Sequence, residues 1–222
     1  MNSLEKILTG KTNEHLVQDT LSGKYVHKDI LEALNDLRSD ASINGFKLEI
    51  ASSFRSYESQ MGIWNAKAKG EKPVLDSHSK PICIQQMSKK ELVYAILRWS
   101  ALPGASRHHW GTDIDVYDSS LIDENYKVQL IPEETIGTGP FAEFHRWLDG
   151  KLESYDFFRP YSRDTGGIAP ERWHLSYSPL SVQYNDSLSY ELIESVISES
   201  SLELKTTILQ ELPEIYFRFI HL

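Results

Sequence analysis

Two short stretches constrain this chain most: Ser106–Val116, which reads SRHHWGTDIDV, and Pro170–Tyr177, which reads PERWHLSY. The first places a histidine, a glycine and an aspartate within a few residues, and the second places a glutamate three residues before a histidine. Together they supply two imidazoles, a carboxylate and a spare carboxylate, which are the ligands and base of a catalytic zinc site. The fold must therefore bring the two stretches together.

Three protein ligands and an open position for water make up such a site. We expect His108, Asp115 and His174 to be the ligands, although by spacing alone His109 could replace His108. Zinc would lower the pKa of the water from about 15.7 to about 7. Glu171 could then take the proton from that water and return it to a leaving amine.

Arg55 follows a predicted strand directly, at a place where site residues often lie. Its guanidinium can bind both oxygens of a carboxylate at once. A metal, a base and such an arginine together describe a carboxypeptidase. Gly111 would permit the tight backbone path between the histidine and the aspartate.

Periodic apolar residues predict helices and strands along the chain. Helices are expected at residues 28–44, 56–69, 88–100, 141–152, 190–197 and 202–212. Strands are expected at residues 46–53, 112–117 and 172–177. Ser88 and Glu91 form a capping box at the start of the third helix. We expect loops at 70–87 and 118–139, and at most one short helix in residues 1–27.

Composition excludes several classes of protein. The net charge of −9 and the pI of about 5.4 argue against nucleic-acid binding. Cys83 is the only cysteine, so an intramolecular disulfide and a cysteine-rich zinc site are excluded. No stretch approaches the ~20 apolar residues of a membrane span, and residues 1–17 lack the apolar run of a signal peptide. We therefore expect a cytoplasmic protein, while the oligomeric state is not predicted.

Three segments resemble the zinc D-Ala-D-Ala carboxypeptidases (VanY-like), which belong to the LAS group together with lysostaphin and the hedgehog signalling domain. SRHHWGTDIDV resembles their S-x-H-x-x-G-x-A-x-D motif, and PERWHLSY resembles their E-x-W-H motif. SSFRSYESQ resembles the segment that carries their substrate-binding arginine. The resemblance covers roughly residues 47–177. It implies an α+β fold, in which a small antiparallel sheet is flanked by helices.

The resemblance assigns the zinc ligands and the base to the residues named above. It further implies that Arg55 holds the terminal carboxylate, that Ser106 and Gln60 contact the substrate, and that Trp173 packs beside the metal. Asp113 departs from the motif, which usually has alanine there, and it could compete for the metal or alter the charge of the site. We expect an N-terminal arm at 1–27, a zinc peptidase domain at 28–180 and a helical appendage packed on it at 181–222.

The implied activity is hydrolysis of the bond before a terminal D-alanine in peptidoglycan stem peptides, muropeptides or their precursors. Cleavage of an L,D bond, or of a free D,D-dipeptide, is a close variant. The alternative is a non-catalytic, zinc-containing module that binds a peptide on the same scaffold. Such a module would need neither a base at Glu171 nor a clamp at Arg55.

Overall fold

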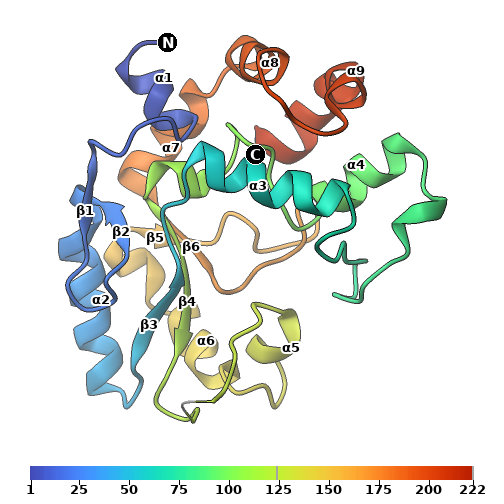
Figure 1. Ribbon diagram of the computed structural model, residues 1–222. Coiled ribbons are helices and arrows are strands. Elements are labelled where there is room, and N and C mark those ends of the chain that lie inside the picture. Colours follow the sequence, from blue (N-terminus) through green and yellow to red (C-terminus); the bar gives the residue numbers. More distant parts are fainter. Residues whose placement is uncertain (124, 222) are drawn as a thin grey trace.

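The computed structural model describes residues 1–123 and 125–221 (Figure 1). A four-stranded antiparallel sheet lies at its centre, in the order β3-β4-β6-β5. Its strands are β3 (Leu48–Ser52), β4 (Asp113–Asp118), β5 (Phe157–Phe158) and β6 (His174–Tyr177). A separate two-stranded sheet pairs β1 (Leu16–Gln18) with β2 (Tyr25–His27). The predicted α+β class with a small antiparallel sheet is thereby confirmed.

Helices surround the sheet. They are α1 (Ser3–Leu8), α2 (Leu31–Ile43), α3 (Tyr57–Ala68), α4 (Lys89–Leu97), α5 (Pro132–Thr135), α6 (Ala142–Asp149), α7 (Ser178–Ser187), α8 (Tyr190–Ser198) and α9 (Lys205–Ile215). Shorter turns are η1 (Lys28–Ile30), η2 (Ile84–Gln86), η3 (Arg107–Trp110), η4 (Leu152–Tyr155) and η5 (Tyr216–Ile220). Each predicted helix is present, with ends that differ by a few residues. The predicted capping box starts α4, with both Ser88–Glu91 hydrogen bonds formed.

Alternation along the central strands separates an apolar face of the sheet from a polar one. Ile114 and Val116 of β4 and Leu175 of β6 are fully buried in a core that includes residues of α2 and α6. Because neighbouring side chains of a strand point to opposite faces, Asp115 and His174 lie on the other face. The two residues are directly paired across β4 and β6. The sheet therefore presents a carboxylate beside an imidazole.

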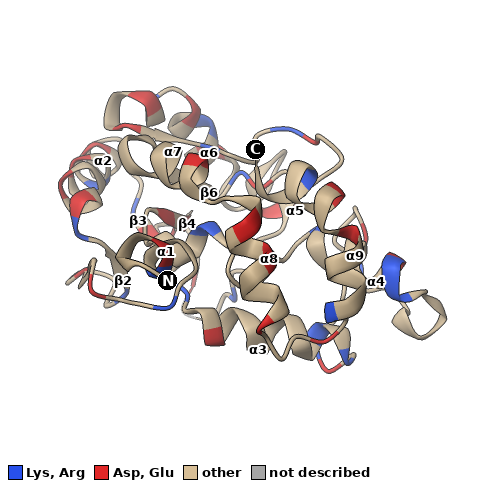
Figure 2. Cartoon of the chain, turned by 90° about the horizontal axis from the view of Figure 1, so that it is seen from above, with Lys and Arg blue, Asp and Glu red and all other residues tan. Residues whose placement is uncertain are grey.

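A second core forms among α3, α4, α8 and α9, which lie together in both views (Figures 1 and 2). Trp64 of α3, Ile96 of α4, Ile197 of α8 and Ile208 of α9 are fully buried within it. Figure 2 shows acidic residues spread over several helices, as expected from the net charge of −9. Among the residues described, no helix is long and apolar enough to cross a membrane.

The N-terminal segment differs from its prediction, because it contains β1 and β2 in addition to one short helix. Three-residue strands are too short to give a periodic pattern, and contacts with the η3 region hold them. The backbone N–H of His27 donates to the Gly111 carbonyl at 2.8 Å. The Trp110 indole N–H donates to the Leu8 carbonyl at 3.1 Å. This segment thus supports the loop that carries the first motif.

Helix α7 was not predicted either. Its buried side chains are those of Ser181 and Asn185, so it lacks the apolar stripe by which a helix is recognised. The one sequence feature that indicates this helix is Pro179 in its first turn, where proline is favoured.

Candidate active site

The turn η3 leads from the first motif into β4, and Gly111 makes that path possible. Gly111 has a φ of 70°, which is favourable for glycine and unfavourable for residues with a Cβ atom. A Cβ atom there would lie only 2.8 Å from the backbone nitrogen of His27. Glycine is thus required at this turn, as the sequence predicted.

His108, Asp115 and His174 meet in one buried group, in which one ligand atom from each lies within 4.8 Å of the others. His108 Nε2 lies 3.3 Å from Asp115 Oδ2, and His174 Nδ1 lies 3.1 Å from Asp115 Oδ1. Asp115 Oδ1 and His174 Nδ1 are buried polar atoms that no hydrogen bond satisfies. Since buried polar atoms normally have partners, this donor set fits a metal ion.

Electrostatics in this group favour the metal-binding forms of His108 and Asp115, but not that of His174. Burial lowers the pKa of His108, which favours its neutral imidazole. Burial opposes ionisation of Asp115, yet His108 and His174 lower its pKa and keep it a carboxylate. Burial would lower the pKa of His174, but the carboxylates of Asp113 and Asp115 raise it to about 10. A metal ion must therefore displace a proton from His174.

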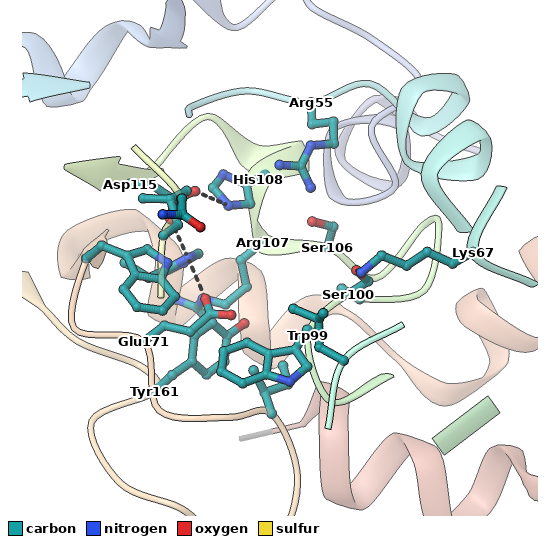
Figure 3. Close-up of a pocket in the computed structure, with 17 residues that line it drawn as sticks. Arg55, Lys67, Trp99, Ser100, Ser106, Arg107, His108, Asp115, Tyr161 and Glu171 are labelled. Atoms are coloured by element: carbon teal, nitrogen blue, oxygen red, sulfur yellow. Dashed lines mark hydrogen bonds and ion pairs between the residues drawn. The ribbon is translucent and has the colours of Figure 1, made fainter. Parts of the chain in front are cut away.

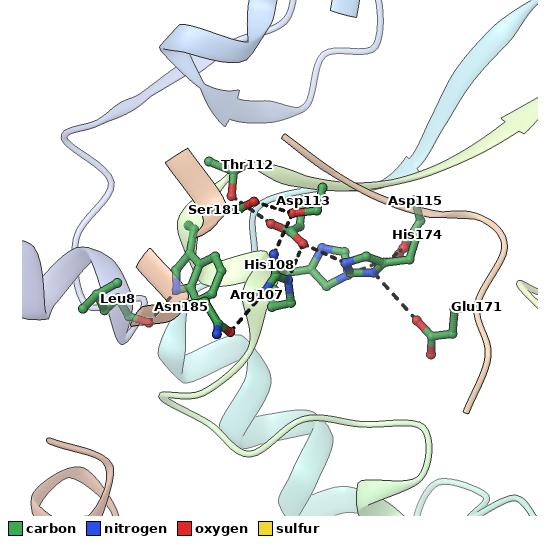
Figure 4. Close-up of polar contacts among 12 residues, drawn as sticks. Leu8, Arg107, His108, Thr112, Asp113, Asp115, Glu171, His174, Ser181 and Asn185 are labelled. Atoms are coloured by element: carbon green, nitrogen blue, oxygen red, sulfur yellow. Dashed lines mark hydrogen bonds and ion pairs between the residues drawn. The ribbon is translucent and has the colours of Figure 1, made fainter. Parts of the chain in front are cut away.

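Asp113 lies beside the group of His108, Asp115 and His174 and orients His174 (Figure 4). His174 donates from Nε2 to Asp113 Oδ1 at 2.9 Å, which leaves Nδ1 directed toward Asp115. Arg107 donates from Nε to the same oxygen at 2.8 Å, and Thr112 donates its hydroxyl to Oδ2 at 2.8 Å. Arg107 lowers the pKa of Asp113 to about 2, although burial opposes this. A carboxylate bound to a ligating histidine in this way fixes the tautomer of its ring.

Glu171 precedes β6 and lines the same cavity as the donor group. Its N–H donates to the Tyr161 carbonyl at 3.0 Å, which fixes the irregular backbone expected after Pro170. Its Oε2 lies 3.7 Å from His174 Nδ1. Burial raises the pKa of Glu171 to about 8, while the charge of His174 opposes the shift. A carboxyl group tuned in this range can both accept and donate a proton near neutral pH.

His109 fixes the backbone of Arg55 instead of joining the metal group. The Gly104 N–H donates to His109 Nε2 at 3.0 Å, so Nδ1 carries the proton and donates to the Arg55 carbonyl at 2.6 Å. The Arg55 N–H in turn donates to the His108 carbonyl at 3.0 Å. Arg55 donates from Nη1 to Gln60 Oε1 at 2.8 Å, which places Gln60 behind Arg55 and not on the cavity wall.

The cavity encloses about 240 Å³ and combines the metal group with a cationic side (Figure 3). In Figure 3, Arg55, Ser106 and Lys67 lie on one side of His108. Further lining residues come from the two predicted loops and from the segments before β6; they include Leu75, Gln129, Leu130, Tyr161, Ile168 and Trp173. Lys67 also lines the cavity, although it was not predicted from the sequence as a site residue.

A signal for Lys67 was present in α3. Gln60, Trp64 and Lys67 follow the i, i+4, i+7 spacing of one helix face. Gln60 and Trp64 are fully buried. A lysine on the buried face of a helix needs a reason, and the cavity supplies one.

Two histidines and an aspartate converge on the polar face of an antiparallel sheet. This arrangement defines the class of the protein as a metal-binding α+β domain. The model of the VanY family, described as D-alanyl-D-alanine carboxypeptidase, matches residues 23–180. The chain belongs to this family. The resemblance seen in the motifs is thereby confirmed.

Solved structures share this fold. "VanYB in complex with D-Alanine-D-Alanine" is similar with a TM-score of 0.54 and 23% identity, over 83% of this chain and 89% of that one. A vancomycin-resistance D,D-pentapeptidase VanY mutant in complex with Zn(II) is similar with a TM-score of 0.53 and 23% identity, over 82% of this chain and 92% of that one. The LdcB LD-carboxypeptidase is similar with a TM-score of 0.52 and 19% identity, over 99% of this chain and 89% of that one.

Two curated relatives are uncharacterized proteins of Haemophilus influenzae. One is 41% identical over 105 residues, which are 46% of this chain and 72% of the relative. The other is 29% identical over 121 residues, which are 54% of this chain and 92% of the relative.

Proposed function

We propose that this protein is a zinc-dependent carboxypeptidase that hydrolyses the C-terminal D-alanine bond of peptidoglycan stem peptides or their precursors. The observation that carries the proposal is the partly buried carboxyl group of Glu171 in one cavity with the metal group and Arg55. Membership of the VanY family and the Zn(II) in a related VanY structure support it. The peptidase unit would be residues 28–180, with 1–27 and 181–222 packed on it.

His108, Asp115 and His174 would hold the ion. When bound, zinc supplies Lewis-acid chemistry and makes water a nucleophile at neutral pH. An Oε atom of Glu171 would take the proton from the attacking water and deliver it to the leaving amine. The positive charge of the ion would favour the carboxylate form of Glu171 before this transfer. Arg55 would bind the terminal carboxylate through its fork of donors.

Two features favour hydrolysis over a module that only binds a peptide. Glu171 is partly buried beside the metal group, and a desolvated carboxyl group without a chemical role is costly to keep. Arg55 keeps its guanidinium at the cavity, braced by Ser52 and Gln60. Binding alone would require neither arrangement.

Mass spectrometry of products tests the proposal directly. The zinc-loaded protein is incubated with stem tripeptides, tetrapeptides and pentapeptides, and release of D-alanine is measured. We expect release by the wild type and a loss of about a hundredfold to ten-thousandfold in kcat for Glu171→Gln. Glu58→Gln, at an exposed position of α3, is the matched control and should keep full activity.

Comparing release from the tetrapeptide with release from the pentapeptide distinguishes the L,D activity from the D,D activity. If the zinc-loaded protein binds these peptides and releases no residue from any of them, the hydrolase proposal is wrong and a binding module remains.

A further inference from the structure

Two cationic side chains reach the cavity without an acidic partner. Arg55 donates to the neutral oxygens of Gln60 and Ser52, at 2.8 and 3.2 Å. Lys67 donates from Nζ to the hydroxyl of Ser100 at 2.7 Å. In the part of the chain that the structure describes, neither cation forms an ion pair with a carboxylate. The cavity therefore holds two positive charges that form no ion pair, although the more distant carboxylates of Asp115 and Glu171 line the same cavity and partly offset them.

Lys67 is held in this position by its helix. It lies near the C-terminal end of α3, one turn after Trp64, which is fully buried and donates its indole N–H to the Glu203 carbonyl. Burial, followed by the charges of Lys72 and Arg55, lowers the pKa of Lys67 to about 8. The amine thus remains largely protonated at neutral pH, at a cost that an anionic ligand would offset.

We propose that Lys67 is a second binding residue for the carboxylate of the substrate's leaving amino acid, acting opposite Arg55. This inference rests on the proposed function and deepens it. Figure 3 shows the Arg55 guanidinium and the Lys67 side chain directed into one cavity, with Ser106 between them. A carboxylate there would receive charged donors on both oxygens, which is the strong form of hydrogen bonding.

The surroundings of Lys67 explain why this clamp would select a free C-terminus. Leu75 and Trp99 add apolar surface next to Lys67 and Ser100. The Trp99 indole N–H donates to the Asp76 carbonyl at 2.9 Å, which ties the 70–87 insert to this wall. An uncharged C-terminal amide would leave both partly buried cations without an ion-pair partner. The pocket would therefore discriminate acid from amide more strongly than one arginine alone.

Binding of uncleaved peptide tests this role separately from turnover. Zinc-loaded Glu171→Gln protein is titrated calorimetrically with diacetyl-L-lysyl-D-alanyl-D-alanine and with the C-terminal amide of the same peptide. The measured quantity is the ratio of the two dissociation constants. Adding Lys67→Met should reduce the preference for the acid by about tenfold or more, whereas Lys67→Arg should retain most of it.

Lys69→Met is the control for a lost positive charge on the same segment, because Lys69 is exposed and pairs with Glu203. It should leave the ratio unchanged. An equal loss of acid and amide binding in Lys67→Met would mean that Lys67 only braces Ser100, and would overturn the inference. An unchanged ratio would do the same. If the Glu171→Gln protein binds neither peptide, the proposed function itself fails together with the inference.

Discussion

Replacing Asp113 by alanine tests whether its carboxylate both neutralises Arg107 and orients His174. Asp113 is fully buried, and its Oδ1 accepts from His174 Nε2 at 2.9 Å and from Arg107 Nε at 2.8 Å. Arg107 is itself only 7% exposed. Because Asp113→Ala leaves that guanidinium buried without a counter-charge, we expect the free energy of unfolding to fall by about 3–5 kcal/mol.

A double variant separates the two roles. Arg107→Met combined with Asp113→Ala removes both charges, and replacing a whole buried pair by apolar groups is often nearly neutral. We therefore expect the double variant to recover most of the lost stability. It cannot recover the hydrogen bond to His174 Nε2, so zinc affinity should stay about tenfold to a hundredfold weaker in both variants.

Urea unfolding of metal-free protein measures the first effect, and competition with a chromophoric chelator measures the second. Asp36→Ala, at an exposed position of α2, is the control and should change neither quantity. The reasoning is refuted if the double variant is as unstable as Asp113→Ala. It is equally refuted if Asp113→Ala binds zinc as tightly as the wild type.

Four further outcomes are expected. Gly111→Ala should destabilise the protein by more than about 1 kcal/mol, because its φ is 70° and a Cβ would lie 2.8 Å from the His27 nitrogen. Gly62→Ala, in α3 with nothing within 4 Å, should instead stabilise it by about 0.5–1 kcal/mol; urea midpoints check both. Burial opposes ionisation of Asp19, but hydrogen bonds from Arg38 lower its pKa. This stabilisation is complete above the unfolded pKa of about 3.9 and is lost as pH falls further, so Asp19→Asn should flatten the acid limb of a stability–pH curve. Removal of zinc by a chelator should abolish D-alanine release and added zinc should restore it, whereas activity that survives chelation would contradict the proposed mechanism.

The fold class, and the meeting of His108, Asp115 and His174 in one group, could be predicted from the sequence. Alternation at Ile114 and Val116 fixed which face of β4 is buried, and therefore that Asp115 faces the opposite side. The motifs were sufficient to name the family, and the family model matches them. Local signals suffice here because strand periodicity, helix capping and motif spacing depend on residues close together in the chain.

How residues from distant segments act on one another could be seen only in the folded protein. From the sequence, Asp113 was a possible competitor for the metal. In the structure it instead accepts hydrogen bonds from Arg107 and His174 and so supports the metal group. Gln60 was predicted to contact the substrate, but it lies behind Arg55. Lys67 was not predicted as a site residue, but α3 places it at the cavity wall. Such roles depend on which side chain fills each hydrogen-bonding position around a buried charge. That competition is resolved only when the whole core has packed.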